Sequence, residues 1–184
     1  MGSRYDDELW ELVPEEERHP PPAHLVEFVR GLGGALHALD VGCGDGRLTA
    51  ELDAAELTAA DVSAVALARA RRRLAGARIV ELDPDAPLPL PDGGFDLVLC
   101  TETIEHVRDV QLFLSEIRRV LHPGGALALT TPSHLPLGPV GDPLSPHLRR
   151  FTRRTLGRLV DELGFGVESL QRRSGSLLLR ARRS

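Results

Sequence analysis

Short apolar runs alternate with amphipathic stretches along most of the chain. Five runs have the length and continuity of buried strands, at residues 36–41, 56–60, 77–82, 95–100 and 126–130. Runs that are apolar at successive positions are typical of parallel strands, which are covered on both faces. Two more strands are predicted at residues 166–171 and 176–182, and the turn between them indicates an antiparallel hairpin.

Helix signals lie between the predicted strands. Ser63 can cap one helix, and Asp109 can cap a second, which the Pro-Gly-Gly stretch before residue 126 would end. A third helix is expected from Thr152 to a stop at Gly164. This alternation predicts an α/β fold. We expect three layers, α/β/α, around a mostly parallel seven-stranded sheet that ends in the hairpin.

The organisation of the chain is expected to be simple. A length of 184 residues with 42% apolar residues predicts one main domain. Residues 1–22 are acidic and end in prolines, so we interpret them as an N-terminal arm or lid ahead of a domain at residues 23–184. No apolar run reaches the ~20 residues of a membrane helix, and the start lacks the layout of a secretory signal. No membrane contact and a cytoplasmic location are therefore expected.

A glycine-rich turn after the first predicted strand is the strongest functional signal. Asp40 is followed by Gly42, Gly44 and Gly46 at alternate positions. Glycines permit positive φ and let a ligand approach the backbone, which predicts a nucleotide-like ligand at the carboxyl end of the strand. Dinucleotide loops use the spacing Gly-x-Gly-x-x-Gly instead, and a carboxylate ahead of the glycines suits a cation. S-adenosylmethionine fits, because it carries a sulfonium and an ammonium group and no phosphate.

Asp61 ends the second predicted strand, where a carboxylate can accept hydrogen bonds from both ribose hydroxyls. Dinucleotide enzymes use the same device, so Asp61 alone does not separate the two kinds of cofactor. A nicotinamide-dependent reductase is therefore an alternative, although the glycine spacing and Asp40 count against it.

Five segments follow one another in an order that carries a family resemblance. They are residues 39–46, 61–63, 87–98, 105–107 and 118–125. Together they resemble the Rossmann-like, class I S-adenosylmethionine-dependent methyltransferases. The resemblance is to the small single-domain, type 11 group that includes the ubiquinone-biosynthesis O-methyltransferases. It covers nearly the whole chain after residue 36 and implies that family's fold, cofactor and reaction, with S-adenosylhomocysteine as the product.

The resemblance assigns the turn after the first strand to the methionine part of the cofactor. It implies that the backbone of Gly42, Cys43, Gly44 and Gly46 holds this part. Asp40 would organise the loop or meet the ammonium group through water.

The rest of the cofactor is assigned to residues further along the chain. By resemblance, Asp61 would bind the ribose and Val62 would pack on the adenine. Asp83 is expected to accept a hydrogen bond from the adenine amino group, with a turn-forming role as the alternative. Thr101 would line the pocket into which the methyl group points.

Methyl transfer is a displacement at an already activated methyl group, so alignment of the acceptor matters most. The expected acceptor is an oxygen or nitrogen of a small molecule. If it is a hydroxyl group, His106 is the best candidate for the general base and Glu105 is the second. The alternative for His106 is a hydrogen bond within its own loop.

Glu102, Glu105 and His106 also lie at helix-like spacing, and a further ligand such as His147 would complete a metal site. A similar arrangement occurs in the small-RNA 3′-end methyltransferases, so an RNA ribose methyltransferase is an alternative. We predict no metal. We also predict no nucleic-acid partner, because the net charge is −5 and only 4% of residues are aromatic. A non-catalytic module that binds S-adenosylmethionine is a further alternative.

Two segments are candidates for covering the site. Residues 133–152 are rich in proline and glycine and contain His134 and His147, and long irregular stretches of this kind are often functional. Tyr5 and Trp10 of the acidic arm could close the pocket, with a hydrophobic anchor for the arm as the alternative.

Overall fold

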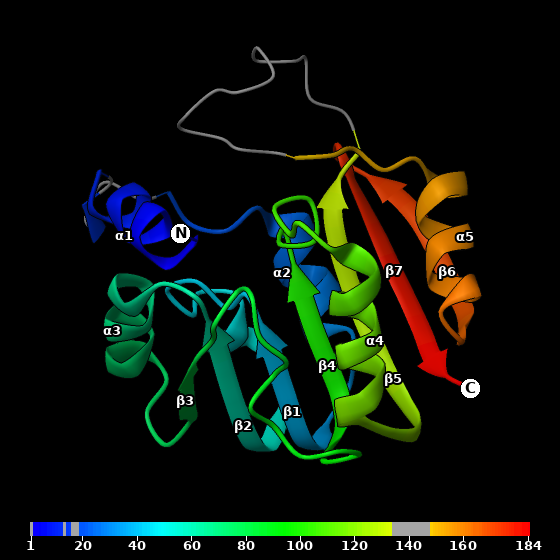
Figure 1. The fold of residues 1–184 in the computed structure, drawn as a ribbon, viewed down its shortest axis with the longest axis horizontal. Helices are drawn as coiled ribbons and strands as arrows, with labels where there is room; N and C mark the ends of the chain where they lie inside the picture. Colours follow the sequence, from blue (N-terminus) through cyan, green and yellow to red (C-terminus); the bar gives the residue numbers. More distant parts are fainter. Residues whose placement is uncertain (1, 13, 16–18, 134–147) are drawn as a thin grey trace. The chain divides into compact units, whose positions relative to one another are not determined.

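The computed structural model describes residues 2–12, 14–15, 19–133 and 148–184. The chain divides into two compact units, residues 1–90 and residues 91–184, each with its own strands and helices (Figure 1). Among the described residues, no helix is both long enough and apolar enough to cross a membrane. The strands of each unit position the candidate site residues of that unit.

The first unit is built on three parallel strands. Its elements are α1 (Gly2–Leu12), α2 (Ala23–Arg30), β1 (Ala35–Val41), the short 3-10 helix η2 (Thr49–Glu51), β2 (Ala54–Asp61), α3 (Ala64–Arg73) and β3 (Arg78–Glu81). β2 pairs in parallel with both β1 and β3. The carboxyl-terminal halves of β1 and β2 are buried. Because Asp40 pairs with Ala59, Asp40 and Asp61 lie near the carboxyl ends of adjacent strands.

Packing of α3 fixes the junction that follows β2. The Ser63 hydroxyl accepts a hydrogen bond from the Ala66 N–H at 3.1 Å and so caps the helix, as predicted. The buried face of α3 includes Leu67 and Ala70, which pack in one cluster with Ala59 of β2. The small side chains of Ala59 and Ala70 at this contact let the helix lie close to the strand.

The second unit contains the other four strands. Its elements are β4 (Phe95–Thr101), α4 (Val110–Val120), β5 (Leu121–Pro132), α5 (Arg153–Glu162), β6 (Phe165–Arg173) and β7 (Ser176–Arg183). β4 and β5 are parallel, while β7 is antiparallel to both β5 and β6. Asp109 caps α4, as predicted, and Thr152, where the last helix was expected to begin, caps α5. The predicted antiparallel hairpin is therefore confirmed.

All seven predicted strands are present, and the mostly parallel α/β fold with its terminal hairpin is confirmed. The predicted end of the helix capped by Asp109 is confirmed, but the predicted start of the strand that follows it was wrong. α4 ends at Val120, and the stretch that contains Pro123 and Gly124 belongs to β5, because Leu121 already pairs with Phe95 of β4. Residues 2–12 and 23–30, for which no helix was predicted, form α1 and α2. The division into an arm at residues 1–22 and a domain after it stays a prediction.

Candidate cofactor and acceptor sites

The turn after β1 is held by the backbone of β2. The N–H groups of Gly42 and Cys43 both donate to the Ala60 carbonyl oxygen, at 2.8 and 3.0 Å. Gly42, Gly44 and Gly46 have φ values of 78°, 54° and 79°, a region that favours glycine. The alternate glycines that define the motif are thus required by the path of the backbone.

Asp61 connects this turn to the start of α3. Its Oδ2 accepts a hydrogen bond from the Gly44 N–H at 2.8 Å, and its Oδ1 accepts one from the Ser63 N–H at 2.9 Å. Burial raises the pKa of Asp61, although these backbone hydrogen bonds oppose the rise. Each carboxylate oxygen has a second lone pair, so Asp61 can still accept hydrogen bonds from ribose hydroxyls.

Asp40 lies beneath the turn and is only 1% exposed. Its Oδ2 accepts a hydrogen bond from the Thr49 hydroxyl at 2.6 Å. Its Oδ1 is buried and has no hydrogen-bond partner among the described residues. Burial raises the pKa of Asp40 to about 7, the Thr49 hydrogen bond opposes this, and the charge of Asp61 adds to it. A buried carboxyl group with one unpaired oxygen suits a cationic ligand nearby.

Two other residues of the turn serve packing. The Cys43 side chain is buried in the cluster that contains Leu67, and burial raises the pKa of its thiol, so only its backbone is available to a ligand. Gly46 has a positive φ, and a Cβ there would lie 2.9 Å from Cδ1 of Leu74, just after α3, so a side chain at this position would be strained. Both predicted residues therefore shape the loop.

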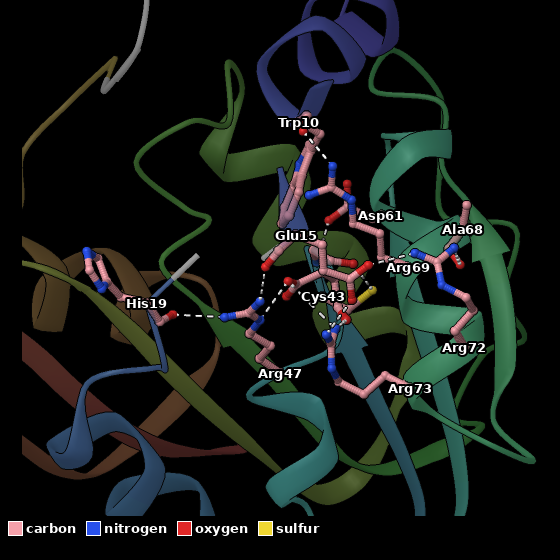
Figure 2. A network of polar contacts seen from close by, with 12 residues as sticks. Trp10, Glu15, His19, Cys43, Arg47, Asp61, Ala68, Arg69, Arg72 and Arg73 are labelled. Carbon is pink, nitrogen blue, oxygen red and sulfur yellow. Dashed lines mark hydrogen bonds and ion pairs between the residues drawn. The ribbon is translucent and has the colours of Figure 1, made fainter. Parts of the chain in front are cut away.

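An ion-pair network beside the turn was not predicted from the sequence (Figure 2). Asp45, which is 4% exposed, lies 2.9 Å from Nε of Arg47. Arg73 of α3 also reaches Asp45 and pairs with Glu15 at 2.8 Å. Glu15 and Arg73 lie far apart in the sequence, so no local pattern could have indicated their contact.

The residues predicted to bind the adenine are less enclosed. Val62 is half-buried and follows Asp61 directly. Asp83 is exposed, and its Oδ1 accepts a hydrogen bond from the Asp85 N–H at 2.9 Å, which is the geometry of a turn-forming residue. The role of Asp83 toward adenine stays a prediction.

In the second unit, the end of β4 leads into a pair of carboxyl groups held by threonines of β5. Thr101, the last residue of β4, is buried. Glu102 follows it with a φ of 50°, and its Oε1 accepts a hydrogen bond from the Thr130 hydroxyl at 2.8 Å. Oε2 of Glu105 accepts one from the Thr131 hydroxyl at 2.9 Å. Two adjacent hydroxyl groups of β5 thus orient two nearby carboxyl groups.

Glu105 and His106 lie side by side but differ in exposure. Glu105 is 2% exposed, and its Oε1, which has no hydrogen-bond partner among the described residues, lies 3.8 Å from Nε2 of His106. Burial and the charge of Glu102 raise the pKa of Glu105 to about 8. The His106 side chain is 38% exposed. Glu105 is therefore mostly protonated at neutral pH.

The alternative metal site is not formed by the part of the chain that the structure describes. Within it, no group of at least three histidine, cysteine, aspartate or glutamate side chains lies close enough to hold a metal ion. His147 and His134, together with most of the segment predicted to cover the acceptor, lie outside the described residues.

Known proteins share this sequence pattern and fold. A family profile described as a methyltransferase domain matches residues 39–129. A probable S-adenosylmethionine-dependent methyltransferase of Mycolicibacterium smegmatis is 39% identical over 142 residues, 71% of this chain and 52% of that protein. The trans-aconitate 2-methyltransferase of Paracidovorax citrulli is 33% identical over 124 residues, 65% of this chain and 47% of that protein. A SAM-dependent methyltransferase structure from Aquifex aeolicus aligns with a TM-score of 0.73 at 19% identity, over 96% of this chain and 97% of that chain.

The fold is therefore the Rossmann-like α/β/α methyltransferase fold. More specifically, the chain belongs to the class I S-adenosylmethionine-dependent methyltransferases, whose cofactor is S-adenosylmethionine. The predicted family, fold and cofactor are confirmed, and the nicotinamide alternative is set aside. The chain spans about half the length of the curated relatives it matches.

Proposed function

We propose that the chain transfers the methyl group of S-adenosylmethionine directly to an oxygen or nitrogen of a small-molecule acceptor. The observation that carries the proposal is the hydrogen bond from the Gly44 N–H to Asp61, which joins the predicted methionine and ribose positions in one unit. Asp40, buried beneath the same turn, supports a cationic ligand in particular.

The residues of the first unit fit such a cofactor. The unpaired oxygen of Asp40 would favour the ammonium or sulfonium charge, and the remaining lone pairs of Asp61 would accept the ribose hydroxyls. Gly44 has no side chain to keep a ligand away from its backbone. When bound, S-adenosylmethionine supplies a methyl group activated by the neighbouring sulfonium.

The residues of the second unit fit the handling of the acceptor's proton. His106 is partly exposed and can receive a proton from a hydroxyl or amine. Glu105, protonated at neutral pH through burial, can donate a hydrogen bond to an acceptor oxygen. The chain's own task is to orient the acceptor and to remove its proton, because the methyl donor is already activated.

The acceptor class is supported by one of the relatives. One relative is named as a methyltransferase of trans-aconitate, a small polycarboxylate, which favours a small molecule over RNA for this chain as well. RNA ribose methylation with a metal has no matching three-residue cluster among the described side chains.

Transfer of a labelled methyl group from S-adenosylmethionine tests the proposal, with a panel of small hydroxyl, amine and carboxylate acceptors beside a short RNA. With an acceptor found, His106→Gln should lower kcat by about 100-fold or more and flatten the pH profile near neutral pH, because the base is lost. His122→Gln, at an exposed histidine of the same unit, is the matched control and should change neither.

An unchanged rate in His106→Gln would show that His106 is not the general base. Methylation of the RNA alone would overturn the small-molecule acceptor. Cofactor binding without transfer to any member of the panel would instead favour the non-catalytic module.

A further inference from the structure

One face of α1 lies on Gly44 of the glycine turn and on the residues that follow β2. Oδ1 of Asp7 accepts hydrogen bonds from the Ser63 hydroxyl at 2.6 Å and the Val65 N–H at 3.2 Å, just after β2. One helical turn further along α1, Trp10 lies on Gly44, where an added Cβ would come within 2.8 Å of the indole Cζ2. Residues one turn apart share a helix face, so a single face of α1 meets both the glycine turn and the start of α3.

Arginines of α3 hold this arrangement in place (Figure 2). Nη2 of Arg69 donates to the Trp10 carbonyl oxygen at 2.9 Å, and the guanidinium carbon lies 5.7 Å from the indole centroid, within cation–π range. Arg72 and Arg73 pair with Glu15 at 2.7 and 2.8 Å. The arginines of α3 therefore contact this part of the chain at three places, which are the Trp10 ring, the Trp10 carbonyl group and the Glu15 side chain.

The indole and a ligand cannot both lie against Gly44. Two ring atoms, Cζ2 and Cη2, lie 2.8 and 2.9 Å from the position of a Cβ, so the ring already fills the space that the missing side chain leaves. That space is where a ligand can approach the backbone of a glycine. Asp7 lies near enough to Asp61 for its charge to add to the effect of burial, which raises the pKa of Asp61.

We propose that α1 is a displaceable stopper of the cofactor site, in which Trp10 occupies the Gly44 surface and must leave it before the nucleoside binds. The inference rests on the cofactor site proposed above. The apparent affinity for the cofactor is then the intrinsic affinity reduced by the fraction of molecules in which α1 is displaced. The contacts of Arg69, Arg72 and Arg73 set that fraction.

Trp10 is the single tryptophan of the sequence, so its fluorescence reports on the stopper directly. The full chain is titrated with S-adenosylhomocysteine, and emission and calorimetric heat are recorded on the same samples. The expected result is a shift of the emission maximum to longer wavelength that follows the binding heat, because the ring leaves Gly44 and Arg69 for water. An emission maximum that stays fixed, or that moves to shorter wavelength, while calorimetry saturates would overturn the stopper.

Variants of α1 and α3 then show whether loss of the Trp10 contact raises or lowers the affinity for S-adenosylhomocysteine. Trp10→Ala should bind S-adenosylhomocysteine about tenfold more tightly if about nine-tenths of wild-type molecules are closed. Arg69→Gln keeps the indole but loses its cation–π contact. Its affinity for S-adenosylhomocysteine should rise by less than that of Trp10→Ala, and its emission maximum should lie at longer wavelength before any ligand is added. Leu12→Ala, at a 63% exposed position on the same helix, is the control and should bind as the wild type does. Weaker or unchanged binding in Trp10→Ala contradicts the proposal.

The failure of this inference differs from the failure of the cofactor site. If calorimetry shows binding in neither the wild type nor Trp10→Ala, the proposed cofactor site is wrong, and the proposed stopper is wrong with it. If the wild type binds with unchanged Trp10 emission, the site stands and only the stopper falls. Binding in Trp10→Ala alone supports a stopper that is closed in nearly every wild-type molecule.

Discussion

At Asp40 the fold keeps a carboxyl group almost wholly out of water, with the Thr49 hydroxyl as its hydrogen-bond donor. Burial raises the pKa of Asp40 to about 7, so at neutral pH the group is balanced between its neutral and ionised forms. A cation that binds nearby favours the ionised form. The same burial on which the proposed role of Asp40 toward a cationic cofactor rests therefore makes its ionisation costly in the free protein.

This cost predicts a pH dependence of stability. The ordinary pKa of an aspartate is 3.8, and burial raises that of Asp40 to about 7. The stabilising contribution of Asp40 to the free energy of unfolding is therefore fully present below about pH 4 and is lost as pH rises through about 7. Across that window the wild type should lose on the order of 1–3 kcal/mol of unfolding free energy relative to Asp40→Asn, which cannot ionise. Urea unfolding at a series of pH values measures the difference, and a constant difference would contradict the assigned pKa.

Residues of the site were predictable where the signal is local. Asp40, Gly44 and Asp61 stand at strand ends and in a glycine turn, which the sequence displays directly. The burial of Asp45 was not predictable, because it depends on arginines brought in by folding. Trp10 lies in a helix and Gly44 in a turn, and the two are far apart in the chain. The role of Trp10 therefore stayed open at the level of the sequence.

At the scale of elements, α4 depends on its cap. Oδ1 of Asp109 accepts hydrogen bonds from the N–H groups of Gln111 and Leu112, at 3.1 and 3.0 Å. Asp109→Ala should therefore lower the unfolding free energy by about 0.5–2 kcal/mol, and Asp109→Ser should restore most of it, because serine also caps helices. Urea unfolding of the three proteins makes the comparison. Equal loss in the serine variant would mean that the cap is not the cause.

The strands and most helices were predictable because apolar runs and capping residues are local signals. Two features were not. The start of β5 was read as a break because Pro123 and Gly124 are poor strand formers, yet pairing of Leu121 with Phe95 extends the strand through them. α1 is polar along much of its length, and its packing against α3 depends on contacts such as Asp7 with Ser63.

At the scale of the whole molecule, the proposed function divides the chemistry between two parts of the chain. In this proposal, residues 1–90 would supply the glycine turn, Asp40 and Asp61 for the cofactor, and residues 91–184 would supply Glu105 and His106 for the acceptor. The family match across residues 39–129 includes parts of both. The proposed function depends above all on the binding of a sulfonium nucleoside by Asp61 and the turn after β1.

Calorimetry of the full chain with S-adenosylhomocysteine and, separately, with NADH tests this claim most directly. The wild type and Glu56→Ala, a control at the exposed end of the same strand as Asp61, should bind S-adenosylhomocysteine equally and should not bind NADH. Asp61→Ala should weaken S-adenosylhomocysteine binding by about 1–3 kcal/mol, because buried polar groups lose their partner. Uptake of NADH with no response to S-adenosylhomocysteine, or equal affinity in Asp61→Ala, would contradict the account.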